Sequence, residues 1–224
     1  MKRSSGIIMP VFSLPSPYGI GTLGKAAYEF IDFLVAAKQS WWQMLPLGPT
    51  GFGDSPYQSF STFAGNPYFI DLDMLVKDGL LKKSELTALD WGEDAEQVDY
   101  GKIYTNRFTV LRKAFQRGFA RDKKEFEAFA AENEWLADYA LYMACKKHFG
   151  MQCWTEWEDE GIRMHRPESV KKYEALLEED IHFYAYVQFL FYTQWEALRA
   201  YAKENEIGII GDVPIYVALD SADV

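Results

Sequence analysis

The residues best suited to chemistry lie in the segment GDSPYQSF, residues 53–60, which combines a carboxylate, hydroxyl groups and an aromatic ring. Asp54 and Ser55 can form hydrogen bonds with the hydroxyl groups of a ligand, and Tyr57 can offer it a ring face. A sugar needs both kinds of partner, because its C–H faces are apolar and its hydroxyl groups are polar. Alternatively, Asp54-Ser55-Pro56 forms an ordinary turn and Tyr57 packs into the core. The pattern alone leaves both interpretations open.

A second candidate is Asp212, which lies in the apolar segment GIIGDVPIYV, residues 208–217. This segment predicts a β-strand, and a carboxylate in a buried strand is costly unless it is hydrogen-bonded or lies at a functional site. We therefore expect Asp212 to point toward the same cleft as Tyr57. Alternatively, Asp212 forms an ion pair with a buried arginine and has only a structural role. The two interpretations overlap, since a carboxylate that supports an active site does both.

Other polar clusters carry weaker signals. Cys145, His148, Cys153 and His165 have the spacing C-x2-H-x4-C-x11-H, which matches no common structural zinc pattern, so we expect no metal. The acidic runs at residues 158–160 and 178–180 are typical of solvated helix flanks, and sequence neighbours cannot face each other across a sugar. The sequence contains no P-loop, and we expect no nucleotide binding.

The elements that must position these residues begin with a βαβ unit. Residues 6–10 and 41–45 are apolar runs that predict two strands, and the apolar residues of 23–34 recur at helical spacing, with Thr22 as the expected N-cap. The loop that follows, residues 46–68, is crowded with Gly, Pro, Ser and aromatic residues, and a loop this long is usually functional. It leaves the second strand at its carboxyl end, where α/β barrels assemble their active sites.

The rest of the chain is predicted to be mainly helical until the third strand at residues 208–217. Apolar stripes at helical spacing run through residues 108–119, 136–143 and 187–202, and Gly150 is expected to cap the second of these helices. We therefore expect an α/β fold with about the first three strands of a (β/α)8 barrel and a large helical insertion. A closed barrel needs eight strands and typically ~250 residues.

Composition limits the class of protein and its partners. The chain has 224 residues, 49% hydrophobic and 25% charged, which is typical of a globular protein. A net charge of -10 would repel a phosphate backbone, so nucleic acid is not an expected partner. The opening residues do not predict a secretion signal, no run reaches membrane-spanning length, and only two cysteines occur. We expect free thiols, no membrane contact and a cytoplasmic location.

Three segments carry a resemblance to a known family. They are SGIIMPVFSLPSPYGIGTLG, WWQMLPLGPTGFGDSPYQSFSTFAGNPYFIDL and QFLFYTQWEALRAYAKENEIGIIGDVPIYVALDSADV. Together they resemble the amylomaltases, also called disproportionating enzymes or 4-alpha-glucanotransferases, within the α-amylase superfamily. They span most of the first 72 residues and the last 37, in the family's order.

The resemblance implies a retaining transfer of α-1,4-glucan on a (β/α)8 barrel, without a cofactor or metal. In such a double displacement a carboxylate attacks the sugar while a second carboxyl group, ~5 Å away, protonates the leaving oxygen. Tyr57, with Ser55 and Asp54 beside it, matches the family's sugar-binding cleft, and Asp212 matches a supporting aspartate on the third strand. The motifs of the nucleophile and the acid/base are absent, and we expect both residues beyond Val224.

The expected organisation has three parts. Residues 1–76 start the catalytic barrel and carry the cleft loop, residues 77–206 form a mainly helical inserted subdomain with a return helix, and residues 207–224 hold the third strand of a barrel cut short at 224. The intact enzyme would act on maltooligosaccharides or α-glucan, whereas this chain alone is expected to be inactive and to self-associate through its open barrel face. The alternatives are a non-catalytic glucan-binding module and a related α-glucan hydrolase.

Overall fold

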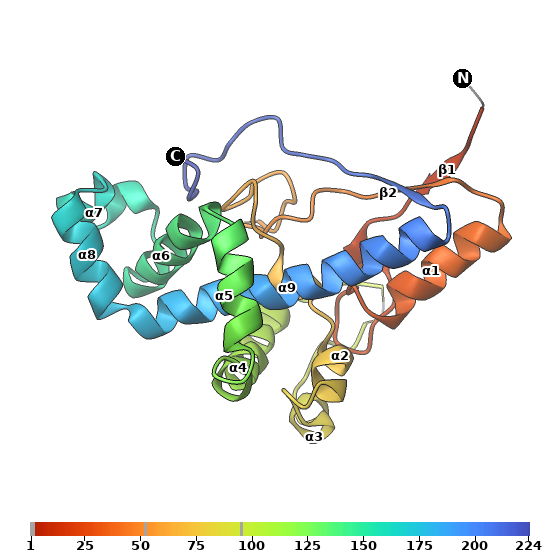
Figure 1. The fold of residues 1–224 in the computed structure, drawn as a ribbon, viewed down its shortest axis with the longest axis horizontal. Helices are drawn as coiled ribbons and strands as arrows, with labels where there is room; N and C mark the ends of the chain where they lie inside the picture. The colour runs from red at the N-terminus through yellow and green to blue at the C-terminus, as the bar shows by residue number, and fades with distance from the viewer. Residues whose placement is uncertain (1–2, 52, 95) are drawn as a thin grey trace.

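The computed structural model describes residues 3–51, 53–94 and 96–224, and its sheet is small and parallel (Figure 1). In the described residues the strands are β1 (Gly6–Ile8), β2 (Trp41–Gln43) and β3 (Gly208–Ile210), in the order β1-β2-β3. Ile7 pairs with Trp42, and Trp42 pairs with Ile209. This is the α/β arrangement predicted for the first strands of a barrel.

One helix connects β1 to β2, and the remaining helices lie between β2 and β3. They are α1 (Lys25–Ala36), α2 (Leu72–Lys77), α3 (Lys83–Thr87), α4 (Tyr100–Gly118), α5 (Lys123–Glu132), α6 (Trp135–His148), α7 (Glu160–Arg163), α8 (Pro167–Leu176) and α9 (Glu178–Glu204). Short 3-10 turns lie at Val11–Ser13, Pro67–Phe69 and Trp154–Glu156. None of the helices in the described ranges is both long enough and apolar enough to cross a membrane.

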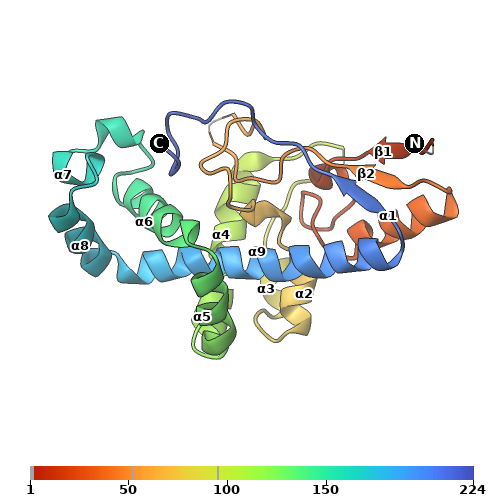
Figure 2. The same cartoon turned by 45° about the horizontal axis from the view of Figure 1, so that its top comes forward.

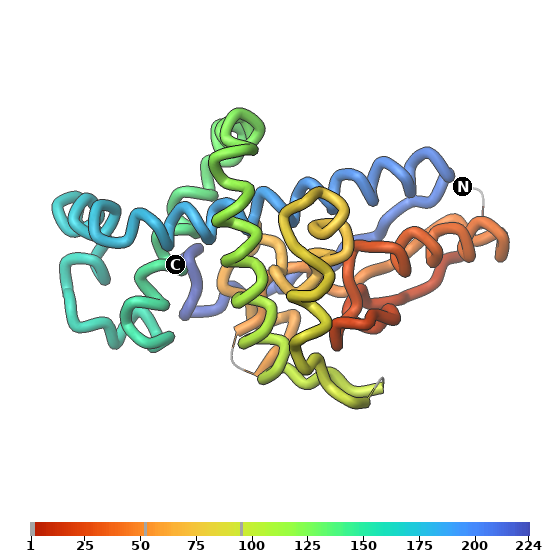
Figure 3. Tube along the Cα trace, turned by 90° about the horizontal axis from the view of Figure 1, so that it is seen from below, coloured from red at the N-terminus to blue at the C-terminus, as the bar shows by residue number. Residues whose placement is uncertain are grey.

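The long helix α9 is the axis of the molecule. Figure 2 shows it running from the α7–α8 end to the strands, and Figure 3 shows α2, α3 and α4 on the side viewed from below. The long loop that follows β2 and the chain that follows β3 lie on the opposite side (Figure 1). Because α9 touches both the helical insertion and the sheet, it can set the position of one relative to the other.

Several bounds of the predicted elements differ from the structure. The first two strands end at Ile8 and Gln43 rather than at residues 10 and 45. The third strand ends at Ile210 instead of residue 217, because its neighbour β2 ends at Gln43 and the last backbone bond between the two chains is donated by Met44 N to Ile210 O at 3.0 Å. Thr22 is not the N-cap of α1; that position is Gly24, and the buried Thr22 hydroxyl donates instead to Asp71 Oδ2 at 2.7 Å. By contrast, Gly150 lies just after α6 with φ 67°, as a C-terminal glycine should.

The two faces of the sheet differ strongly in exposure. On the helix side, Trp42 is fully buried, lies 4.9 Å from Phe30 between ring centroids, and donates from its indole nitrogen to Met9 O at 2.8 Å. On the other face, Ile8 is 60% exposed and Ile210 is 42% exposed. This apolar face is the one that points toward the interior in a closed barrel.

Helix α9 holds the loop after β2 with two buried glutamines. The amide of Gln188 accepts from Gly65 N at 2.7 Å and donates to Gly65 O at 3.0 Å. The amide of Gln194 does the same at Asp71, with distances of 2.6 Å from Asp71 N and 3.1 Å to Asp71 O. Each glutamine thus satisfies both backbone groups of a buried loop residue, as a neighbouring strand would.

We expect replacement of Gln188 by Leu to lower the free energy of unfolding by about 3 kcal/mol, since Gly65 would be left with two buried unpaired backbone groups. Urea denaturation measures the change. Gln116→Leu, at an exposed glutamine of α4, is the control and should leave the midpoint nearly unchanged. Equal midpoints for the two variants would contradict this role for Gln188.

We also propose that the 224-residue chain, prepared by itself, self-associates through the exposed sheet face. Apolar side chains at Ile8 and Ile210 would gain by leaving water. Light scattering should then give a mass above the 25.8 kDa of a single chain. Ile210→Lys should shift the mass toward the monomer, whereas a monodisperse 25.8 kDa species in the unaltered chain contradicts the proposal.

Candidate functional site

The segment of residues 53–60 forms the tip of the loop after β2. Thr50 and Ser59 pair as an isolated antiparallel bridge, and Gly51 N donates to Gln58 O at 3.0 Å, which closes the tip at its base. Asp54 adopts a left-handed conformation with φ 53°, a region that Asp tolerates better than most residues. The tip is therefore a compact, hydrogen-bonded turn.

Asp54 and Ser55 both serve this turn. The Thr50 hydroxyl donates to Asp54 Oδ1 at 3.3 Å, and partial burial raises the pKa of the Asp54 carboxyl group above its ordinary value, with the Thr50 hydrogen bond acting in the opposite direction. The Ser55 hydroxyl accepts from Tyr57 N at 3.3 Å. Asp54-Ser55-Pro56 thus forms a turn, as one of the two interpretations predicted. The polar atoms of Asp54 and Ser55 that these bonds do not use lie at a half-buried surface.

Tyr57 is not packed into the core: it lies on the loop after β2 with 47% of its surface exposed. Its hydroxyl donates to Asp212 Oδ2 at 2.9 Å, which joins two residues far apart in the sequence. This hydrogen bond to a carboxylate, followed by desolvation, raises the pKa of the Tyr57 phenol. The structure therefore brings together the two residues that the sequence placed at one cleft.

Asp212 lies just beyond the carboxyl end of β3 rather than inside a strand, which corrects the expectation from its apolar surroundings. The alternative role, an ion pair with a buried arginine, is wrong: within the described ranges, no Lys, Arg or His nitrogen lies within ion-pair distance of Asp212. The buried arginine Arg107 lies elsewhere and donates to Ile70 O at 2.9 Å. The hydrogen-bond partner of Asp212 is the Tyr57 hydroxyl.

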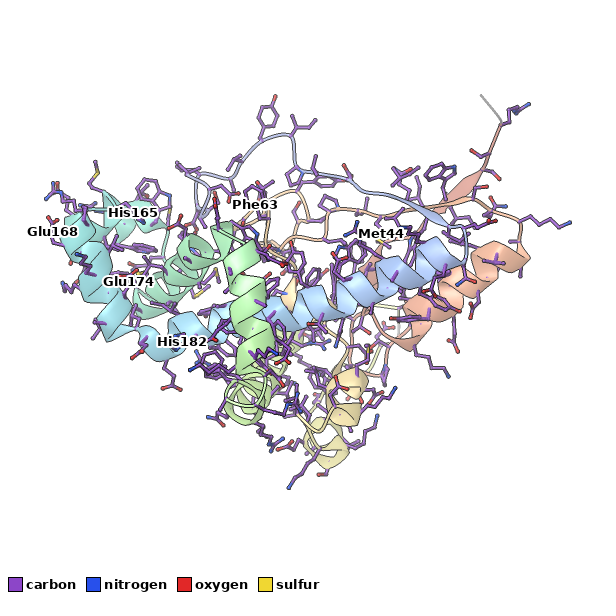
Figure 4. All side chains as sticks on the ribbon, in the orientation of Figure 1. Met44, Phe63, His165, Glu168, Glu174 and His182 are labelled. Atoms are coloured by element: carbon purple, nitrogen blue, oxygen red, sulfur yellow. The ribbon has the colours of Figure 1, made fainter. Side chains whose placement is uncertain are left out.

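A pocket of about 180 Å³ opens beside Asp212 at the carboxyl ends of β2 and β3. Its lining is rich in aromatic rings, which come from the loop after β2 and from α9, namely Phe63, Phe191, Tyr192 and Trp195. Phe63 and Met44, which also lines it, lie on the same side of α9 in Figure 4. Larger hollows of about 320 and 710 Å³ lie elsewhere, and neither is lined by Tyr57 or Asp212.

Sequence reasoning missed the contribution of α9 to this pocket. Tyr192 and Trp195 are only partly buried although both are large and aromatic, and the Tyr192 hydroxyl donates to Phe63 O at 2.5 Å. In the sequence Trp195 lies four residues after Phe191 and three before Leu198, at the spacing of the predicted apolar stripe, whereas Tyr192 lies off that stripe. The position of Tyr192 was the available signal. Phe63 itself is 56% exposed, unlike a core phenylalanine.

The remaining polar clusters have structural partners. Burial raises the pKa of the Cys145 thiol to about 12, and both cysteines are free. Asp159 accepts from Gly161 N at 2.8 Å at the start of α7, and Asp180 is bound by Arg112 and Lys147. Among the residues that the structure describes, no group of three or more His, Cys, Asp or Glu side chains is arranged to hold a metal ion.

Comparison with known proteins identifies the family. The model of a glycoside hydrolase family described as 4-alpha-glucanotransferase matches residues 9–224. The chain belongs to the 4-alpha-glucanotransferase family. It is 51% identical over 225 residues to a 4-alpha-glucanotransferase of Streptococcus pneumoniae, and 45% identical over 230 residues to one of Thermus thermophilus. Both alignments cover 100% of this chain and 45% of the relative, so the chain spans less than half the length of these curated relatives.

Solved structures of 4-alpha-glucanotransferase relatives agree with the fold. Amylomaltase from Streptococcus agalactiae, determined in complex with acarbose, superposes with a TM-score of 0.97 at 43% identity, over 99% of this chain and 45% of that one. Amylomaltase from Corynebacterium glutamicum gives a TM-score of 0.69 at 20% identity, over 98% of this chain and 31% of that one. The second likeness concerns the fold alone.

The raised pKa of Asp54 gives a pH-dependent prediction. A carboxyl group whose pKa is higher in the folded than in the unfolded state lowers the free energy of unfolding as pH rises through these values. Asp54→Asn removes that loss, and asparagine tolerates the same left-handed backbone. We therefore expect Asp54→Asn to be more stable than the unaltered protein at pH 7, with the difference vanishing below the ordinary pKa of an aspartate.

Urea denaturation at a series of pH values measures this difference. The control is Asp94→Asn, at an exposed aspartate outside this loop, and its effect should vary much less with pH. An Asp54→Asn variant that is less stable at pH 7 than in acid, relative to the unaltered protein, would show that the charge of Asp54 stabilises the turn.

Proposed function

We propose that the full-length gene product is a 4-alpha-glucanotransferase that moves α-1,4-glucan segments between maltooligosaccharides, and that this chain supplies one wall of its substrate cleft. The observation that carries the proposal is the hydrogen bond between Tyr57 and Asp212, which joins the loop after β2 to the loop after β3. Both loops leave parallel strands at their carboxyl ends, where barrel enzymes bind their substrates.

The proposed role of Tyr57 is a platform for one sugar ring. Its hydroxyl is held by Asp212 at 2.9 Å while nearly half of its surface stays exposed, so the ring is oriented and a face remains open to ligand. Asp212 is proposed as a supporting group, since its hydrogen bond keeps the ring in that orientation. Ser55 and Asp54 shape the turn beneath the ring and offer polar atoms to sugar hydroxyl groups.

We assign neither carboxylate of a double displacement to this chain, and we propose that residues 1–224 alone do not transfer glucan. The nucleophile and the proton donor of a retaining enzyme lie about 5 Å apart on opposite sides of the scissile bond. Residues 1–224 would contribute binding and orientation instead, because an acceptor held in place can compete with water for the glucosyl-enzyme. The three-part organisation at 1–76, 77–206 and 207–224 and a cytoplasmic location are parts of this proposal.

The aromatic pocket beside Asp212 supports a saccharide ligand. Phe63, Tyr192 and Trp195 offer aromatic ring faces in the pocket that Asp212 also lines, and Asp212 adds a carboxylate. Such a combination suits a molecule whose rings are apolar above and below and polar around the rim. A nucleotide or a nucleic acid would instead call for cations, and no Lys or Arg lines this pocket in the described residues.

Incubation of the full-length gene product with maltotriose tests the proposed function. Transfer predicts glucose together with maltooligosaccharides longer than maltotriose, whereas glucose and maltose alone indicate a hydrolase and unchanged maltotriose indicates a binding protein at most. We expect Tyr57→Ala to lower kcat/KM for transfer roughly tenfold, the order of effect expected for loss of an aromatic contact. The melting temperature should change little, because Tyr57 is exposed.

The matched control for Tyr57→Ala is Tyr201→Ala. Tyr201 also donates to a carboxylate, Asp32 Oδ1 at 2.6 Å, but it does so between α9 and α1, away from the cleft. Its removal should leave transfer within about twofold of the unaltered enzyme, as for a surface residue outside the site. Equal losses of transfer in the two variants would show that the effect of Tyr57 is not specific to the cleft.

A further inference from the structure

The chain between β3 and residue 219 is held mainly at its two ends. Within the described residues, no backbone hydrogen bond fixes the stretch of residues 211–218, and its one side-chain hydrogen bond is that of Asp212 to Tyr57. Figure 1 shows this stretch passing from the strands toward α6. Ile215 and Tyr216 are 89% and 84% exposed, so packing does little to hold it. The path of the chain through Asp212 therefore depends on both attachments, the one at Ile210 and the one at the far end.

At that far end, Asp220 attaches the chain to the helical insertion. The Asp220 carboxylate accepts from Lys146 Nζ at 2.6 Å, from Tyr142 Oη at 2.7 Å and from Trp154 N at 3.3 Å. The Lys146 side chain is 3% exposed, so this ion pair is largely shielded from water. A shielded charge pair with additional hydrogen bonds defines one geometry and is costly to break.

Three residues further on, Asp223 attaches the same chain to the loop that carries Tyr57. Asp223 Oδ2 accepts from Thr62 N at 2.6 Å and from the Thr62 hydroxyl at 2.7 Å, and Oδ1 accepts from the Ser61 hydroxyl at 3.2 Å. Ala222 N adds a backbone bond to Phe60 O at 2.8 Å. The loop with Tyr57 and the chain with Asp212 thus share one point of attachment.

We propose that Asp220 and Asp223 are positioning residues that form a clasp, in which Asp220 binds α6 and Asp223 binds Ser61 and Thr62. The clasp fixes the loop after β2 and the chain after β3 in one frame, and so sets how Tyr57 and Asp212 meet. This inference rests on the proposed function only in the claim that the Tyr57–Asp212 pair binds sugar. The new claim is that Asp220 and Asp223, which lie outside the cleft, determine substrate affinity by positioning the Tyr57–Asp212 pair.

The experiment compares Asp223→Ala with Asp223→Asn in the full-length gene product. Alanine removes the Oδ2 acceptor of both Thr62 hydrogen bonds and the Oδ1 acceptor of the Ser61 bond, whereas the asparagine side-chain oxygen can still accept from Thr62. Asp223 is exposed, so neither change creates a buried defect. For Asp223→Ala we expect the KM for maltotriose to rise about fivefold and kcat to stay within about twofold, because ground-state binding is what the clasp serves. Asp223→Asn should restore most of the KM.

A control variant and a double variant separate the clasp from a merely structural role. Lys147→Met removes the neighbouring lysine of α6, whose partner is Asp180 at 2.8 Å, and should leave KM unchanged. In a Tyr57→Ala background, Asp223→Ala should add nothing further, because both changes act on the same contact. An unchanged KM in Asp223→Ala, or effects of Tyr57→Ala and Asp223→Ala that simply add, would overturn the proposal.

Hydrogen exchange tests whether the clasp holds the loop after β2, independently of catalysis. The amides of Gly51 and Gln58 are hydrogen-bonded within the tip of the loop after β2, at 3.0 and 3.1 Å. Asp223→Ala should speed their exchange at least severalfold, and Lys147→Met should not. If the unaltered protein transfers no glucan, the proposed function fails while this measurement still stands, and unchanged exchange of both amides in Asp223→Ala overturns the clasp.

Discussion

The site depends first on the two glutamine side chains that α9 extends to the loop after β2. A parallel sheet of three short strands cannot hold a long loop by itself, because the loop continues past the end of the sheet, where no neighbouring strand meets its backbone groups. Gln188 and Gln194 supply the missing partners by bonding both backbone groups of Gly65 and of Asp71. Gly65 must be a glycine there, since a Cβ atom would lie 2.0 Å from the Phe191 ring. A helix thereby does for this loop what a fourth strand would do, and the loop can present Tyr57 outward.

Most of the fold could be predicted, because the spacing of apolar residues along a helix shows which of its residues are buried. The stripe that predicted α1 lies on residues that are fully buried in the structure, such as Ala27, Ile31 and Leu34. Strand ends were less predictable, since β-propensity continues through Val213 and Ile215 although β2 offers them no partner. Thr22 shows a related limit. A threonine before a helix fits the local rule for an N-cap, but its hydroxyl donates instead to the carboxylate of Asp71, which is distant in sequence.

The meeting of Tyr57 and Asp212 could be predicted, whereas the α9 rings of the pocket and the contacts that support the loop could not. Gly, Pro and aromatic content marked the loop of Tyr57, and a carboxylate among apolar residues marked Asp212, because both features are costly unless something uses them. Nothing local in the sequence pairs Gln188 with Gly65 or Asp223 with Thr62. Those contacts join segments that only the folded chain brings together, and glutamine, aspartate and threonine are ordinary surface residues in any sequence pattern.

Location finally separates the two roles that aromatic residues play in this chain. Phe115 of α4 and Phe183 of α9 each lie at helical spacing from other apolar residues of their helix. Their ring centroids lie 5.8 Å apart with nearly perpendicular planes, so the two rings form a core contact between α4 and α9. Tyr57 and Phe63 lie instead on the loop after β2 and remain 47% and 56% exposed. Exposing large apolar rings costs solvation free energy, so a protein that fixes them with buried amides and a shared aspartate clasp must gain something at that surface. A ligand with apolar faces and a polar rim would recover that cost, and this supports the proposal that the loop is a sugar-binding wall.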